Sequence, residues 1–174
     1  LSDVQDYLSN LPTNLHSRLW INADIMAGPG EDLNDAIAQK KIQPKFNAEE
    51  FVQVVSTQLP GTVLSIGWTT SLSDRYAPYT DIMVDNMIEC CKSFPNVTFP
   101  IRGTSFKGSW STLKRLYDTN PAWTITLWWS FKLSLDEFKF IHNTLESDET
   151  FRDRTYYDLR GFRDYLLETE KKMD

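Results

Sequence analysis

The chain has 174 residues, of which 41% are hydrophobic and 24% charged, and its formal net charge is −6. This composition predicts one globular domain with a core of its own, not a disordered chain. No cluster of lysine and arginine offsets the acidic balance, which argues against a nucleic-acid partner because such partners require a basic surface. No apolar run approaches the roughly 18 residues of a membrane span. The chain begins Leu1-Ser2-Asp3, without Met or a signal peptide, and we expect it to be a piece of a longer precursor.

Four short segments are rich in β-branched and aromatic residues and are bounded by turn residues, a pattern typical of β-strands. They are predicted at 19–25, 62–69, 97–102 and 123–130. Capping signals and apolar stripes predict helices between and after these strands. The helices are expected at 47–59, 83–94, 110–117, 134–145 and 162–170, following the end of an earlier helix at 2–11. The stretch 26–46 is the longest irregular segment. Alternating strands and helices predict a single α/β domain over 1–174 with parallel strands.

Each predicted strand has one apolar face and one face of small or polar residues. An open, doubly wound sheet is covered on both sides and usually reads apolar throughout. The polar face therefore favours the C-terminal half of a (β/α)8 barrel of the TIM type, with a doubly wound, flavodoxin-like sheet as the alternative. Four strands do not close a barrel. We expect the other four to come from residues N-terminal to this chain or from another chain, and to pair with the first strand near Trp20 and the last near Trp128.

Three blocks in a fixed order carry a family resemblance. They read Trp20-Ile21-Asn22-Ala23-Asp24-Ile25-Met26-Ala27-Gly28-Pro29, Leu64-Ser65-Ile66-Gly67-Trp68-Thr69-Thr70 and Val97-Thr98-Phe99-Pro100-Ile101-Arg102, and the later Thr126-Leu127-Trp128-Trp129 and Tyr156-Tyr157-Asp158-Leu159 also fit. Over residues 15–159 the chain resembles the C-terminal half of a menorin-family domain.

The resemblance implies a barrel similar to those of phospholipase-C-like and glycerophosphodiester phosphodiesterases. It also implies secreted or cell-surface members that act in cell adhesion and dendrite patterning. The acidic and His positions of a phosphodiesterase would then lie in the first half of the domain, outside this chain. The expected localisation is therefore extracellular or at the cell surface.

Barrel sites form at the carboxyl ends of the strands, where polar residues gather in this sequence. The expected ligand-binding mouth consists of Asn22, Asp24, Thr69, Arg102, Trp128 and Ser130. Asp24 is the candidate metal ligand, although one carboxylate is too few for Ca²⁺ or Mg²⁺, which take several oxygens. Arg102 has two open roles: an ion pair with Asp24 inside the barrel, or binding of a phosphate. Trp128 is expected either in the core or stacked on a ligand.

Other polar side chains offer no catalytic set. His16 and His142 lie away from the predicted strand ends, and no nucleotide-binding loop is present. Cys90 and Cys91 fit no metal or redox spacing and share an apolar helix stripe, so we expect buried thiols, with pairing to a Cys elsewhere in a longer protein as the alternative. Asn96 begins a glycosylation sequon at the start of a predicted strand.

Two functional hypotheses follow. The first is a non-catalytic extracellular or cell-surface interaction protein, whose partners are the N-terminal half of the same domain and extracellular adhesion or receptor proteins. The alternative is a metal-dependent phosphodiesterase-like hydrolase whose acidic catalytic residues lie in the missing half. The sequence identifies no cofactor, and a divalent cation in the complete barrel is the one candidate.

Overall fold

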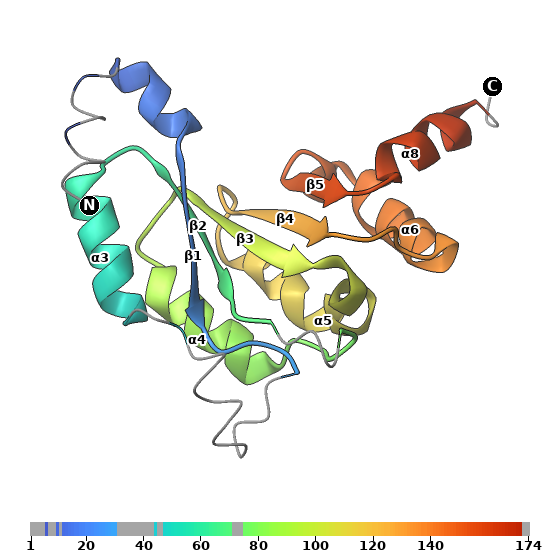
Figure 1. The fold of residues 1–174 in the computed structure, drawn as a ribbon, viewed down its shortest axis with the longest axis horizontal. Coiled ribbons are helices and arrows are strands. Elements are labelled where there is room, and N and C mark those ends of the chain that lie inside the picture. The colour runs from blue at the N-terminus through green and yellow to red at the C-terminus, as the bar shows by residue number, and fades with distance from the viewer. Residues whose placement is uncertain are drawn as a thin grey trace.

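The computed structural model describes residues 6, 10, 12–30, 44, 47–70 and 75–171. The helix expected at 2–11 and most of the irregular segment expected at 26–46 therefore lie outside the described residues. Strands and helices alternate along the rest of the chain (Figure 1). The elements are η1 Thr13–Arg18, β1 Trp20–Met26, α3 Ala48–Gln58, β2 Val63–Trp68, α4 Asp81–Cys91, β3 Val97–Arg102, α5 Gly103–Thr119, β4 Thr124–Trp129, α6 Leu135–Ile141, η2 His142–Glu146, α7 Glu149–Arg152, β5 Thr155–Leu159 and α8 Phe162–Glu170.

The described strands form one parallel sheet in the order β1-β2-β3-β4-β5. The α/β class and the four predicted strands are confirmed, but the expected strand count is wrong because β5 was not predicted. Residues 155–159 make a short strand that contains an aspartate, so they lack the long apolar pattern of a buried strand. Doubly wound sheets reverse their strand order at an internal strand, as in the flavodoxin-like order 2-1-3-4-5. In this sheet every strand lies next to the strand that precedes it in the sequence, without such a reversal, which contradicts the flavodoxin-like alternative.

The pairing expected at the last strand near Trp128 is also wrong. That strand, β4, pairs along its whole length with β5 of the same chain, from Ile125 opposite Thr155 to Trp129 opposite Leu159. β1 pairs with β2, and no other described strand adjoins it. The edges of the described sheet are therefore β1 and β5.

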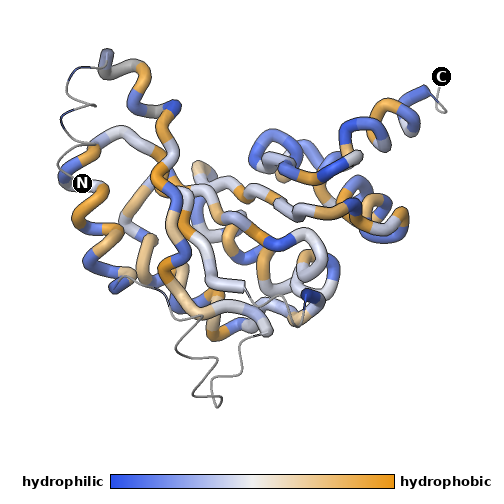
Figure 2. The backbone as a smooth tube through the Cα atoms, viewed as in Figure 1, coloured by the Kyte–Doolittle hydropathy of each residue, from blue (hydrophilic) through white to orange (hydrophobic). Residues whose placement is uncertain are grey.

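One face of the sheet packs against the helices and holds the core. Ile66, Phe99 and Leu127 project to this face from three adjacent strands and are fully buried. The helices contribute apolar stripes, such as Val52 and Val55 of α3. Figure 2 shows apolar and polar positions alternating along the helices, as expected where one side packs on a sheet. Burial of these side chains is the main favourable term in the folding of the domain.

The other face of the sheet is polar and curved. Trp20 of β1 and Tyr156 of β5 belong to the two edge strands, with three strands between them, yet their ring centroids lie 5.1 Å apart. Both rings are also partly open to solvent, Trp20 by 41% and Tyr156 by 47%. Figure 1 shows the accompanying twist, with β1 running nearly vertical and β4 nearly horizontal in the view. The sheet is therefore bent strongly enough for its two edges to meet through their side chains.

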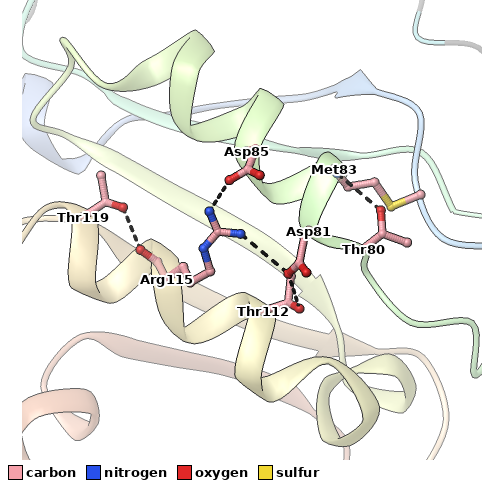
Figure 3. A network of polar contacts seen from close by, with 7 residues as sticks. All are labelled: Thr80, Asp81, Met83, Asp85, Thr112, Arg115 and Thr119. Atoms are coloured by element: carbon pink, nitrogen blue, oxygen red, sulfur yellow. Dashed lines mark hydrogen bonds and ion pairs between the residues drawn. The ribbon is translucent and has the colours of Figure 1, made fainter.

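Helices α4 and α5 are joined by a polar network on their outer surfaces (Figure 3). The Arg115 guanidinium of α5 forms ion pairs with Asp81 and Asp85 of α4, and the Thr112 hydroxyl donates to Asp81 at 2.8 Å. These groups are substantially exposed, so the network sets the relative position of the helices more than it adds to stability.

Local signals explain where several helices begin. The capping box expected at 134–137 is present: Ser134 Oγ accepts from the Glu137 backbone, while the Glu137 carboxylate accepts from the Ser134 backbone. Asn47 caps α3 in a similar way, by accepting from the Glu50 N–H at 3.0 Å. The helix expected at 110–117 is longer than predicted, because α5 starts directly at Gly103, where β3 ends.

Candidate functional site

The carboxyl ends of the parallel strands form the edge where a site is expected. Register places the polar side chains of this edge on one face: Asp24 pairs with Gly67, and Arg102 pairs with Trp128, which in turn pairs with Asp158. Asp24 and Arg102 thus belong to the same face of the sheet, as the barrel interpretation requires.

Asp24 lies over a gap that a glycine leaves in the neighbouring strand. A Cβ atom at Gly67 would lie 3.3 Å from Asp24 Oδ1, so glycine gives the carboxylate its room. Two residues earlier in β1, the Asn22 side chain accepts a hydrogen bond from Ser65 Oγ at 3.3 Å. Asp24 keeps part of its surface exposed, but the neighbouring groups remove enough water from its carboxyl to raise the pKa above its ordinary value of 3.8. The site therefore holds a carboxylate whose charge is not compensated by a cation of the described residues.

Replacing Asp24 with Asn is expected to stabilise the protein at neutral pH. The raised pKa means that the folded protein disfavours the ionised form of Asp24. The protonated carboxyl therefore contributes stability below pH 3.8, and the folded protein loses this contribution as the pH rises through the folded-state pKa. Asp24→Asn removes this loss, and its gain in melting temperature should disappear on acidification below pH 3.8. Glu168→Gln, at an exposed position of α8, controls for the loss of one negative charge. A gain that grows on acidification would contradict the assigned cause.

Arg102 is fully buried at the end of β3. Its Nε and Nη2 donate to Ser105 Oγ at 3.1 and 3.0 Å, and its backbone N–H donates to the Tyr79 hydroxyl. Burial raises the pKa of Tyr79 to about 12, so this hydroxyl is neutral. No ion pair joins Arg102 to Asp24 within the part of the chain that the structure describes. The guanidinium thus fixes the start of α5 against β3 and is closed to solvent.

Thr69 lies just beyond β2, and its hydroxyl donates to the Met26 carbonyl at 3.4 Å. The chain leaving β1 passes very close here, since a Cβ at Gly28 would collide with the Thr69 carbonyl and the Trp68 side chain. Thr69 and Gly28 therefore form a tight structural contact at the rim, beside the mouth.

Trp128 and Ser130 do come together, in a pocket of about 310 Å³ at the ends of β4 and β5. Trp128 is half-buried and Ser130 exposed. The same pocket is lined by Asp158 and Arg160, which the sequence reasoning missed because it did not predict β5. The sequence does carry a signal: in the family block Tyr156-Tyr157-Asp158-Leu159 and the Arg160 that follows it, charged residues come after two aromatic residues, as suits the carboxyl end of a barrel strand.

A larger pocket of about 600 Å³ lies on the helical side of the sheet, between α3, α4 and the ends of β1 and β2. Cys90 lines it and is partly exposed, while Cys91 is buried and donates its thiol to the Met87 carbonyl at 2.9 Å. Burial raises the pKa of both thiols. Both are free and mostly protonated at neutral pH, so they are poor nucleophiles.

The remaining candidates lie away from the strand ends. His16 belongs to η1, before β1, and His142 belongs to η2. Asn96 is exposed, but the Val97 and Thr98 that follow it are buried in β3. Across the described ranges, no group of three or more His, Cys, Asp or Glu side chains could hold a metal ion. Among the same residues, no helix has the length and apolar character needed to cross a bilayer.

Comparison with known proteins gives two matches. Residues 1–163 match a family model described as the menorin N-terminal domain. Over 151 residues the chain is 27% identical to Protein FAM151B of Homo sapiens, an alignment that covers 84% of this chain and 51% of the relative. The chain therefore spans about half the length of this curated relative. No solved structure matches the chain significantly. The match over most of its length shows that the chain belongs to the menorin family.

Proposed function

We propose that this chain is the second part of a (β/α)8 barrel. The support is the curvature of the sheet: Trp20 and Tyr156, from strands four places apart, meet across the concave face. In a barrel of about eight strands, opposite strands are also four places apart, and the interior is just wide enough for side chains to fill it. The described residues contain five strands, so three more would complete such a barrel, one fewer than the sequence alone predicts. The relative has enough additional length to supply them.

The proposed function is that of an extracellular or cell-surface interaction protein of the menorin type, acting in cell adhesion and dendrite patterning. Family membership supports this assignment. The observation that carries it is the polar face of the sheet, on which Asn22, Asp24 and Asp158 are exposed and Trp128 is half-buried. Exposed polar groups beside an aromatic ring on a rigid sheet are suited to recognising a partner.

A cell-adhesion assay tests this function. Full-length protein displayed on cells is expected to promote their adhesion, and Asn22→Ala/Asp24→Ala should reduce it several-fold because both side chains belong to the mouth. Ile82→Ala on α4 is the matched control, since this side chain is 73% exposed on the far side of the sheet. Equal adhesion for the double variant and the unmodified protein would contradict the proposal.

A metal-dependent phosphodiesterase-like hydrolase is the second candidate. One observation favours it: a carboxylate with a raised pKa at a strand end, Asp24, without a compensating cation among the described residues. Such carboxylates occur at catalytic and metal sites. The described residues alone do not fit a divalent cation, so further oxygen ligands and the catalytic acids would have to come from outside the chain. Turnover of a phosphodiester by full-length protein, lost in Asp24→Asn, would favour this candidate over the first.

A further inference from the structure

The pocket at the ends of β4 and β5 is lined by residues with four different kinds of functional group. Trp128, Trp129 and Ser130 line one side, and residues 157–160 line the other. Register places Trp128 beside Asp158 on the concave face, and Ser130 directly follows β4. The residues that line this space of about 310 Å³ thus bring an aromatic ring, a hydroxyl, a carboxylate and a guanidinium to one place.

Two cationic side chains stand beside this pocket. Gly161 has a φ of 82°, and a Cβ at this position would lie 3.4 Å from the Lys132 Cε. The Lys132 side chain therefore passes along the backbone next to Arg160. Neither cation forms an ion pair with another described residue. Because the pocket holds one carboxylate, that of Asp158, these two cations give it a net positive charge in a chain whose formal net charge is −6.

We propose that this pocket binds a hydroxylated ring that carries an oxyanion, as in a sugar phosphate or a sugar carboxylate. Arg160 and Lys132 hold the oxyanion through charge-assisted hydrogen bonds. The Asp158 carboxylate accepts hydrogen bonds from ring hydroxyls, which a bare anion does not offer. Ser130 donates or accepts, and Trp128 presents a flat apolar surface to the ring.

The position of the pocket agrees with this chemistry, although this part of the argument rests on the proposed barrel. If three strands precede β1, then β4 and β5 are the seventh and eighth strands. The loops after these two strands commonly form the phosphate site of (β/α)8 barrels. With three strands instead of four before β1, the seventh and eighth strands are followed by Ser130 and Arg160. The expected anion site therefore moves from Arg102, which is buried and bonded to Ser105, to Arg160, which lines a pocket.

Calorimetric titration of the full-length protein tests the proposal with four probes: a hexose monophosphate, glucuronate, inorganic phosphate and an uncharged hexose. One or both charged sugars should bind more tightly than the uncharged hexose, and the tighter of the two identifies the oxyanion. Arg160→Gln should weaken that binding about tenfold or more, because it removes a charge-assisted contact. Asp158→Asn should weaken binding of the charged sugar but leave inorganic phosphate unaffected or tighter.

Arg163→Gln is the matched control, since it removes the same charge from an exposed position of α8 that does not line the pocket. It should leave binding nearly unchanged. The proposal is overturned if neither charged sugar binds at millimolar concentration, or if Arg163→Gln weakens binding as much as Arg160→Gln. Adhesion measured with the same variants separates the two proposals: binding without adhesion supports the pocket alone, and adhesion without binding supports the interaction function alone.

Discussion

The isolated 174-residue chain is expected to show no cooperative thermal transition as a monomer. The outer edge of β1 carries backbone donors and acceptors that no described strand pairs, and the concave face leaves the Trp20 and Tyr156 rings partly open to water. Parallel sheets are rarely stable unless both faces are covered, and open edges favour association between chains. The chain should therefore self-associate, or melt gradually, unless the remaining strands are supplied.

Circular dichroism during heating, combined with sedimentation of the same sample, measures both parts of this prediction. Full-length protein is the control and should melt in one transition. If the proposed barrel is correct, co-expression with the part of the full-length protein that supplies the other strands should restore a soluble complex. A single sharp transition from a monomer of the isolated chain would count against the barrel, whatever the outcome of the adhesion assay.

Trp123→Ala is expected to lower the free energy of unfolding of the full-length protein by about 3–5 kcal/mol, the range for deleting a large buried aromatic side chain. Trp123 precedes β4 and is 1% exposed. Its ring packs edge-on against Phe99 with centroids 5.2 Å apart, and its Nε1 donates to the Phe94 carbonyl at 2.8 Å. The substitution would leave both a cavity and a carbonyl without its donor.

Urea unfolding followed by circular dichroism gives the change directly. Phe131→Ala is the control, because Phe131 is 65% exposed just after β4, and it should change stability far less. Trp123→Phe keeps most of the packing but loses the hydrogen bond, so its effect should fall between the two. A loss below about 1 kcal/mol in Trp123→Ala would mean that the core does not depend on this side chain.

The fold class could be predicted from the sequence because the helical and strand periodicities of apolar residues are local patterns. The apolar stripe of α4 and the alternation in β4 depend on neighbouring residues alone, and both elements formed close to the expected bounds. β5 was missed because its strand character comes from pairing with β4, while its own residues include the exposed Tyr156 and Asp158. The length of α5 was missed because it begins without a side-chain cap, directly after β3.

The candidate site was predicted less completely than the fold. Strand alternation placed Asp24, Arg102 and Trp128 on one face, and the register agrees. Alternation does not reveal which side chains are already engaged, and Arg102 is bonded to Ser105 three residues later. It also does not reveal Arg160, whose position at the pocket follows from the strand that was missed. Such contacts depend on the tertiary arrangement, which local sequence patterns do not determine.

The strand order has a consequence for the order of folding. Each strand pairs with its nearest strand along the chain, so each pairing closes one strand–helix–strand unit, a smaller loop than any other parallel pairing within this sheet would close. The contact between Trp20 and Tyr156 is the opposite case, since its partners lie near the two ends of the sheet in sequence. It can form only after all five strands have assembled. The environment of the Trp20 indole should therefore report the last step of folding.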